Sequence, residues 1–325
     1  MTEYNELLKK IGFEEKAIIT VNNKNVHVCV GRLNLRDVII KIVPKIEIAK
    51  VQGFYKEAIV DDILEQNNKD LSKPLILKAR VLAVGQNEEH AWIIRRYYPG
   101  RALSIDKDEK KLFVDRLSTI ERKYLFKKDI IRQVVQNIKS LRSLSTNMRK
   151  SGIRRDTFQR RFGDSLEYIN VKKIEDSLDV DLSAKIVFYE KYCKNYFDKK
   201  NIVACTGDLT PANIILKKDG QVIFSDFEWF CLDNNTIDVA FLWLFLYKYQ
   251  GWQKYLIKTF VVSEEDKINF QVSLIRILLY WFDKAFKNDH PSIKSLDNRK
   301  RYKKHIWVKY LKLTGESFEA LMKAR

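Results

Sequence analysis

The chain has 325 residues, enough for two domains that each bury a hydrophobic core. Hydrophobic residues make up 46% of the sequence, a share typical of globular proteins, which excludes an intrinsically disordered chain. The formal net charge of +18 favours an anionic partner such as a nucleotide, a nucleic acid, a lipid surface or a phosphorylated substrate, although a composition rich in Lys, Ile, Asn and Tyr along the whole chain gives the same excess without any partner.

The first hundred residues are predicted to form a sheet with one helix. Apolar and β-branched residues alternate or follow one another in short runs, with turn sequences such as NNKN and NLRD between the runs. In GFYKEAIVDDILEQN, from Gly53, the apolar residues recur at helical spacing. The predicted strands are 17–21, 25–33, 37–43, 79–85 and 90–98.

After the Pro-Gly break at 99–100, most segments have helical spacing. Two short strands, NIILKK and QVIFSD, are the exception, and the Asp219-Gly220 pair predicts a hairpin turn between them. The stretch 147–182 is highly charged and has no clear period. The predicted helices are 107–122, 128–146, 183–198, 237–250, 265–287 and 298–323.

Together these segments predict an α+β protein with two lobes. Residues 1–98 would form a small β-rich lobe, and residues 99–325 a larger, mainly helical lobe with a β-hairpin inside it. The apolar run VAFLWLFLY, from Val239, is about half as long as a membrane span and predicts a buried helix. The charged N-terminal segment does not have the pattern of a signal peptide. We therefore expect a cytoplasmic protein with no membrane span.

Neither the cysteines nor the histidines indicate a disulfide framework or a zinc site. The four cysteines form no Cys-x-x-Cys pair, and the four histidines are scattered, with no carboxylate or thiol nearby at ligand spacing. We expect reduced thiols and no histidine-based metal site. The residues in question are Cys29, Cys193, Cys205, Cys231, His27, His90, His290 and His305.

One stretch, TGDLTPANIILKKDGQVIFSDFEWF from Thr206, places three oxygen-bearing side chains among strand-like residues. Asp208 and Asn213 are five residues apart, and Asp226 follows 13 residues later. Phosphoryl transfer needs a carboxylate that accepts the proton of the attacking hydroxyl, and oxygen ligands for Mg²⁺ on the phosphates. The hairpin would bring Asn213 and Asp226 to one metal site. Short turn sequences such as Gly-Asp occur by chance, but the complete string is far more specific.

The segment GDLTPANIILKKDGQVIFSDFEW resembles the signature of the aminoglycoside phosphotransferase and choline kinase group, within the protein-kinase-like superfamily. The likeness is patchy outside Gly207–Glu228 and extends from about Lys41 to Tyr247, through VIIKIV, FYKEAIVDDIL and IIRRYYPGRALS. It implies a bilobal protein-kinase-like fold, with a small antiparallel sheet and one helix in the N-terminal lobe and a larger helical C-terminal lobe.

By this resemblance, Asp208 would be the catalytic base, and Asn213 and Asp226 would bind Mg²⁺. Glu228 would be either a residue behind the metal ligands or an exposed loop acid. Asp238, in an Asp-x-Ala segment, would start a core helix rather than act in catalysis.

The resemblance also implies a set of ATP-binding residues. Lys41 would contact the α- and β-phosphates, and Glu57 would hold Lys41 by an ion pair. Backbone groups near Arg96 and Tyr98 would meet the edge of the adenine. The simpler interpretation is that Lys41 is a solvent-facing strand lysine and Glu57 part of a solvated helix face.

Two features depart from the pattern of the group. The histidine that precedes Gly-Asp and braces the catalytic loop is replaced by Thr206. The first strands carry no Gly-rich loop, so NNKN would have to cover the phosphates. These departures leave open a nucleotide-binding pseudokinase or regulatory protein without transferase activity.

The sequence therefore predicts a Mg²⁺- and ATP-dependent phosphotransferase that acts on a hydroxyl of a small molecule, such as a sugar, an amino alcohol or an aminoglycoside. A nucleic-acid binder is the third class considered. It rests on the net charge and on NRKRYKK at 298–304, but aromatic residues are not interleaved with the basic runs. We therefore expect a nucleotide and a small-molecule acceptor as partners, and no nucleic acid.

Overall fold

The computed structural model describes residues 4–22, 26–69, 78–104, 127–152, 169–196, 202–287, 300 and 302–323. The chain divides into two compact units. The first comprises Met1–Arg101 and Ile215–Phe230, and the second comprises Ala102–Ile214 and Cys231–Arg325. The segment 215–230, which holds most of the hairpin, thus packs with the N-terminal sheet.

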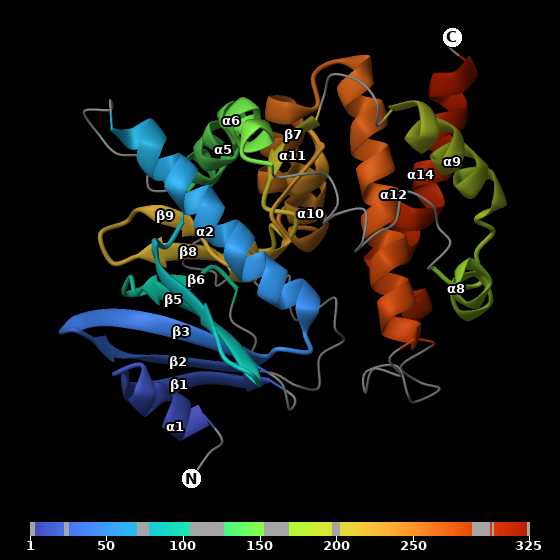
Figure 1. The fold of residues 1–325 in the computed structure, drawn as a ribbon. Coiled ribbons are helices and arrows are strands. Elements are labelled where there is room, and N and C mark those ends of the chain that lie inside the picture. Colours follow the sequence, from blue (N-terminus) through green and yellow to red (C-terminus); the bar gives the residue numbers. More distant parts are fainter. Residues whose placement is uncertain are drawn as a thin grey trace. The chain divides into compact units, whose positions relative to one another are not determined.

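An antiparallel sheet of five strands dominates the first unit, in the order β1-β2-β3-β5-β4 (Figure 1). Helix α2 (Ile48–Asn68) connects β3 to β4, and a short helix, α1 (Tyr4–Lys10), precedes β1. The strands are β1 (Glu14–Asn22), β2 (Val26–Leu33), β3 (Arg36–Pro44), β4 (Val81–Gln86) and β5 (His90–Arg96).

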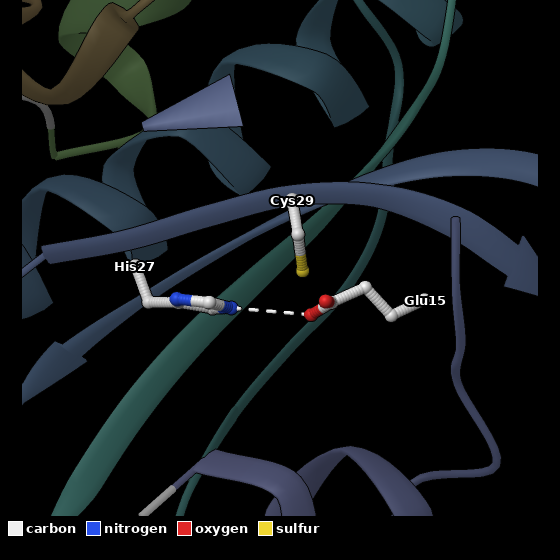
Figure 2. Close-up of side chains that lie close together, drawn as sticks. All are labelled: Glu15, His27 and Cys29. Atoms are coloured by element: carbon white, nitrogen blue, oxygen red, sulfur yellow. Dashed lines mark hydrogen bonds and ion pairs between the residues drawn. The ribbon is translucent and has the colours of Figure 1, made fainter. Parts of the chain in front are cut away.

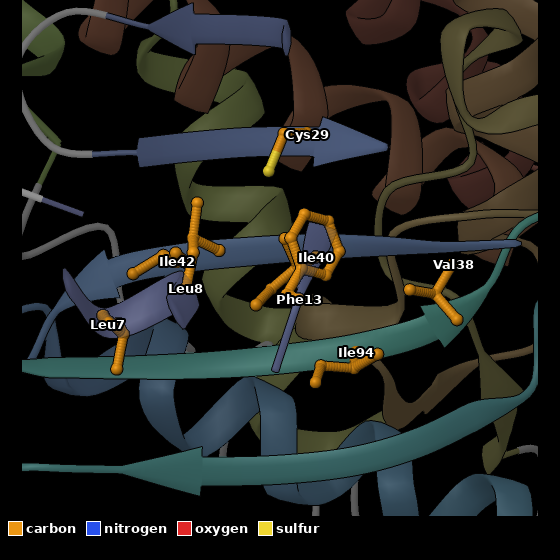
Figure 3. Packing of buried hydrophobic residues seen from close by; sticks show 8 residues of the cluster. All are labelled: Leu7, Leu8, Phe13, Cys29, Val38, Ile40, Ile42 and Ile94. Carbon is orange, nitrogen blue, oxygen red and sulfur yellow. The ribbon is translucent and has the colours of Figure 1, made fainter. Parts of the chain in front are cut away.

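The sheet buries both of its faces, because successive residues of a strand point to opposite sides. On β3, Ile40 and Ile42 belong to one buried cluster, whereas Val43 belongs to another. The first cluster lies against α1 and consists of Leu7, Leu8, Phe13, Cys29, Val38, Ile40, Ile42 and Ile94 (Figure 3). The second includes Phe54 of α2 and consists of Val43, Phe54, Ala91 and Ile93. Lys41 therefore faces α2.

A three-stranded sheet, in the order β6-β8-β9, contains the predicted hairpin and a short strand that begins at Gly100. Its strands are β6 (Gly100–Ala102), β8 (Ile214–Lys217) and β9 (Val222–Phe224). The turn between β8 and β9 uses Gly220 at a φ of 86°, a conformation that glycine adopts without steric cost. The predicted hairpin is thus present, and its second strand leads directly to Asp226.

The second unit is mainly helical and carries a two-stranded pair, β7 (Ile202–Cys205) with β10 (Cys231–Asn234). Helix α10 is buried almost all round, as expected from its apolar run, and packs against α12. Within the described parts of the chain, no helix has the length and apolar character of a membrane span. The helices are α5 (Lys128–Ser143), α6 (Ser145–Lys150), α8 (Val171–Leu178), α9 (Ser183–Tyr196), α10 (Ile237–Phe245), α11 (Gln250–Phe260), α12 (Glu264–Lys287) and α14 (Ile306–Lys323).

The predicted strands of the first unit each overlap an observed strand. The predicted helix 237–250 was too long, because α10 ends at Phe245 and a turn precedes the separate helix α11. Helix α1 and the strands β6, β7 and β10 were not predicted; each is short, and the strands form only by pairing with distant segments. The predicted helix 107–122 lies outside the described residues, as do Asn23 to Asn25 of the NNKN turn.

Replacement of Ile40 by alanine should lower the free energy of unfolding by about 2–5 kcal/mol, because this side chain is fully buried between the sheet and α1. Ile46→Ala is the matched control. Ile46 is 84% exposed, so its truncation should change stability by less than about 0.5 kcal/mol. Urea unfolding of both variants checks this prediction, and equal losses would contradict the assignment of the core.

Candidate active site

Lys41 lies at the middle of β3 with its side chain buried beneath α2. Its Nζ donates to Oε2 of Glu228 at 2.7 Å and to Oδ1 of Asp226 at 3.1 Å. Burial disfavours the charged ammonium, but the carboxylates of Asp226 and Glu228 outweigh this effect and raise the pKa of Lys41. The lysine is therefore held as a cation against the loop that follows β9.

Glu57 projects from α2 and is also buried, but its partners differ from the prediction. Its Oε1 and Oε2 accept hydrogen bonds from Nε and Nη2 of Arg95, each at 2.6 Å. The ammonium of Lys78 lies 3.7 Å from Oε1. Burial would raise the pKa of Glu57, but Arg95 and Lys78 hold it below its usual value. The predicted ion pair between Lys41 and Glu57 is thus wrong for this structure.

The register of the sheet explains the exchange of partners. Arg95 on β5 is paired with Ile39 on β3. Ile39 and Lys41 are two residues apart on β3 and point to the same face, so Arg95 lies on the same face of the sheet as Lys41. A guanidinium binds both oxygens of a carboxylate at once, which a lysine ammonium does not do. Arg95 therefore pairs with Glu57, and the carboxylate of Glu228 pairs with the ammonium of Lys41.

Lys78 completes this buried charge network. Its Nζ lies 2.9 Å from Oδ1 of Asp61, on the next turn of α2, and 5.8 Å from the centre of the Phe227 ring. Across the network, three cations face four carboxylates. The cations are Lys41, Arg95 and Lys78, and the carboxylates are Glu57, Asp61, Asp226 and Glu228.

The loop after β9 carries Asp226 in the left-handed region, at a φ of 59°. The short 3₁₀-helix η3 (Phe227–Trp229) follows and packs against α2. Gly53 of α2 permits this approach, because a Cβ there would lie 2.7 Å from the Cβ and the carbonyl oxygen of Glu228. Burial and the neighbouring Asp226 raise the pKa of Glu228. The sequence allowed Glu228 to be either a residue behind the metal ligands or an exposed loop acid. In the structure it is buried and belongs to the charge network around Lys41.

Arg96 is the last residue of β5, and Tyr98 lies two residues beyond it. The guanidinium of Arg96 is 5.3 Å from the centre of the Tyr98 ring. The backbone N–H of Arg96 donates to the carbonyl of Arg80, and that of Tyr97 to the carbonyl of Asp37. Arg96 and Tyr97 also line a cavity of about 670 Å³ with Arg36, Asp37 and Arg80. None of the charged groups around Lys41 lines this cavity.

The predicted catalytic loop lies in the second unit, between β7 and the 3₁₀-helix η2 (Pro211–Asn213). Gly207 turns the chain with a φ of 74°, and the half-buried Asp208 follows it. The carbonyl of Asp208 accepts from the backbone N–H of Thr210 and from Nδ2 of Asn213, each at 2.8 Å. This second bond occupies the amide nitrogen of Asn213, so its side-chain oxygen is the atom suited to bind a cation.

Asp238, in the first turn of α10, braces this loop. Its Oδ1 accepts from Oγ1 of Thr206 at 2.8 Å and from the backbone N–H of Gly207 at 3.1 Å. Its Oδ2 accepts from the backbone N–H of Thr206 at 2.8 Å. Burial raises the pKa of Asp238 to about 6, although these hydrogen bonds oppose the rise. Thr206 thus takes part in bracing even without an imidazole.

A second buried ion pair supports the strands around the loop. Arg276 of α12 donates to both oxygens of Asp233 on β10, with its Nη1 at 3.1 Å from Oδ1. Strand β10 pairs with β7, which leads into Thr206. No pattern in the sequence pointed to Arg276, Arg95 or Lys78, because each pairs with a residue more than 15 positions away in the chain.

No protein-family model matches the sequence, and no curated protein matches it. Solved structures do. A thermostable mutant of aminoglycoside phosphotransferase APH(4)-Ia, in a ternary complex with ADP and hygromycin B, matches with a TM-score of 0.66 and 11% identity, over 98% of this chain and 99% of that one.

Two further enzymes match over most of their length. Aminoglycoside 2′-phosphotransferase-IIIa, in its GDP complex, has a TM-score of 0.55 and 9% identity, over 96% of both chains. Choline kinase LicA from Streptococcus pneumoniae has a TM-score of 0.53 and 11% identity, over 94% of this chain and 96% of that one. The chain therefore has the fold of aminoglycoside phosphotransferases and choline kinase, and the predicted protein-kinase-like α+β fold is confirmed.

Replacement of Arg95 by methionine should lower the free energy of unfolding by about 3 kcal/mol or more, because it leaves the buried carboxylate of Glu57 with only the more distant Lys78. Arg96→Met is the matched control on the neighbouring, exposed position, and should change stability by less than about 0.5 kcal/mol. Denaturant unfolding measures both. A small loss in the Arg95 variant would contradict the role of the bidentate pair.

The free energy of unfolding should depend on the protonation of Asp238 between about pH 4 and pH 6. Because its folded pKa is raised from 3.8 to about 6, the folded protein binds this proton more tightly than the unfolded chain does. Its contribution to the free energy of unfolding therefore decreases as the pH rises through this window, by up to about 3 kcal/mol. Asp238→Asn lacks the titration, so the stability of wild type relative to this variant should fall from pH 4 to pH 6. A constant or rising difference would contradict the raised pKa.

Proposed function

We propose that the protein is an ATP-dependent phosphotransferase that transfers the γ-phosphate to a hydroxyl of a small molecule. The observation that carries this proposal is the buried Lys41, whose ammonium is held beside the carboxylate of Asp226 in a chain with a kinase-like fold. A lysine in this setting suits the phosphates of a nucleotide, which are the anions that its positive charge would neutralise.

Asp208 is the proposed catalytic base. It follows a glycine turn in a loop whose main-chain N–H groups are held by the buried carboxylate of Asp238, so its backbone position is fixed by a side chain that is itself buried. Its carboxylate would orient the acceptor hydroxyl and take up the proton as the oxygen attacks the γ-phosphorus. The bond from that phosphorus to the bridging oxygen breaks, and ADP leaves.

Asn213 and Asp226 are the proposed ligands of Mg²⁺. Their side-chain oxygens are the hard donors that this ion prefers, and few protein ligands are needed because waters and phosphate oxygens complete its coordination. The network around Lys41 has one carboxylate more than it has cations, and this excess of negative charge favours a divalent cation. The phosphates that bind with the ion would offset the positive charge that remains. When bound, the ion would offset the negative charge of the phosphates.

Lys41 is proposed to bind the α- and β-phosphates, with Glu57 acting through Arg95 and Lys78 rather than directly on Lys41. The backbone N–H groups of Arg96 and Tyr97 already donate within the first unit. The adenine edge is therefore proposed to meet the carbonyl of Arg96 and the backbone of Tyr98. ATP is the nucleotide we propose, by analogy with the ADP-bound aminoglycoside phosphotransferase.

The acceptor class is proposed from the neighbours, which are named for aminoglycosides and choline. A sugar, an amino alcohol or an aminoglycoside each offers a hydroxyl to phosphorylate. The basic stretch with Arg154, Arg155, Arg160 and Arg161 lies outside the described residues and contributes nothing to this choice. The cytoplasm is the proposed location, in keeping with the free thiols of Cys29, Cys205 and Cys231.

Asp208→Asn should lower the turnover of small-molecule phosphorylation by about two to four orders of magnitude, the usual effect of losing a positioned base, while ATP still binds. Asp129→Asn, which changes an exposed aspartate on α5, should retain wild-type turnover. The assay supplies γ-labelled ATP, Mg²⁺ and a small-molecule extract, and mass spectrometry detects metabolites that gain labelled phosphate.

A metabolite labelled by wild type and by Asp129→Asn, but not by Asp208→Asn, would support the reaction and name the acceptor. Equal labelling by all three proteins would refute the role of Asp208. ATP binding without any labelled metabolite would instead favour a nucleotide-binding regulatory protein. Thr206→His would then test whether the missing histidine is responsible.

A further inference from the structure

Three potential metal ligands meet on the face of the sheet opposite to Lys41. They are the carboxylate of Glu15 on β1, and the imidazole of His27 and the thiol of Cys29 on β2 (Figure 2). One ligand atom from each side chain lies within 4.8 Å of those from the other two. His27 and Cys29 are buried, whereas the side chain of Glu15 is 32% exposed, so the cluster has one ligand at the surface.

Strand geometry creates this cluster from residues that are unremarkable in the sequence. His27 and Cys29 are two residues apart on β2, so their side chains point to the same face. They lie opposite Ile42 and Ile40 of β3, which face α1. Glu15 reaches the cluster from β1, where the register shifts just after it, between Glu15 and Ala17. The sequence predicts no histidine-based metal site, because the histidines are scattered and no carboxylate or thiol was assigned to them at ligand spacing. That prediction overlooks Cys29, two residues from His27, and Glu15, which comes close only through the pairing of β1 with β2.

We propose that Glu15, His27 and Cys29 form a Zn²⁺ site. Sulfur, nitrogen and oxygen donors together select zinc or a similar transition ion rather than Mg²⁺. Ligands of a tetrahedral zinc with bonds of about 2.0–2.3 Å lie about 3.3–3.6 Å from one another. Nε2 of His27 is 3.4 Å from Oε2 of Glu15, which is this spacing. A water would complete the coordination from the solvent side.

Charge balance supports the same ion. A thiolate and a carboxylate neutralise a divalent cation, so the loaded site would bury no net charge while His27 binds as neutral imidazole. The ring of Tyr4 in α1 stacks on the imidazole, with centroids 5.0 Å apart, and fixes its plane. Bound zinc would therefore tie β1 to β2 beneath α1. This role is structural and separate from the proposed phosphotransfer.

The alternative is a cluster satisfied without any ion. Burial and the carboxylate of Glu15 raise the pKa of Cys29 to about 12. The thiol would then stay protonated and donate a hydrogen bond to the carboxylate of Glu15. The side chain of Glu15 would then hold His27 and Cys29 by hydrogen bonds alone. The two possibilities differ in whether the folded chain takes up zinc.

The test uses the untagged full-length protein, reduced and stripped of metals by a chelator, and Zn²⁺ alone as the probe. Bound zinc is counted by elemental mass spectrometry after dialysis, and Co²⁺ is substituted to detect a thiolate-to-metal absorption band. We expect one zinc per chain, the absorption band, and a melting temperature that rises with zinc concentration. Glu15→Gln and Cys29→Ser should each weaken zinc binding by at least about tenfold.

Two matched controls accompany these variants. Glu14→Gln changes the neighbouring exposed acid on β1, and Cys231→Ser changes a buried thiol in the second unit; both should bind zinc as wild type does. Glu15→Gln keeps the test decisive if Cys29→Ser fails to fold, because Glu15 is partly exposed. Absence of bound zinc in wild type, or equal binding by Glu15→Gln and wild type, would overturn the proposal.

Discussion

Compensation of buried charge is the constraint on which the first unit depends. Lys41 and Arg95 lie under α2, where an unpaired charge would cost several kcal/mol, so each cation fixes a carboxylate and is fixed by it. Arg95 binds Glu57 through both oxygens, and this frees Lys41 to face Asp226 and Glu228. The direction of the ammonium is thus a property of the whole network rather than of Lys41 alone.

In the second unit, hydrogen bonds from main-chain N–H groups hold a buried carboxylate, as the cations do in the first unit. Asp238 accepts from the backbone N–H groups of Thr206 and Gly207, so two of the bonds that hold the start of the proposed catalytic loop involve only main-chain donors. Threonine adds its hydroxyl to the same carboxylate. These bonds hold the loop although the sequence has Thr206 where the resemblance predicts a bracing histidine.

The sheet joins the proposed nucleotide chemistry to the proposed zinc site. Lys41 and Ile40 are neighbours on β3 but face opposite sides, and Ile40 is paired with Cys29 on β2. An ion bound by Glu15, His27 and Cys29 would therefore tie β1 to β2, and β2 is the neighbour of the strand that carries Lys41. The registers of β1, β2, β3 and β5 set both sites, since a slip by one residue would move a side chain to the other face.

The local elements and the proposed catalytic residues could be predicted from the amino-acid sequence. Alternation of apolar residues located the five strands, helical spacing located α2, and the spacing of Asp208, Asn213 and Asp226 indicated the fold. The partners of the buried charges could not be predicted, because they depend on the packing of distant segments. Glu57 pairs with Arg95 across 38 residues, and Lys41 with Glu228 across 187. Such pairs depend on strand register and on which cation lies within hydrogen-bonding distance of a given carboxylate. Neither property produces a periodic pattern in the amino-acid sequence.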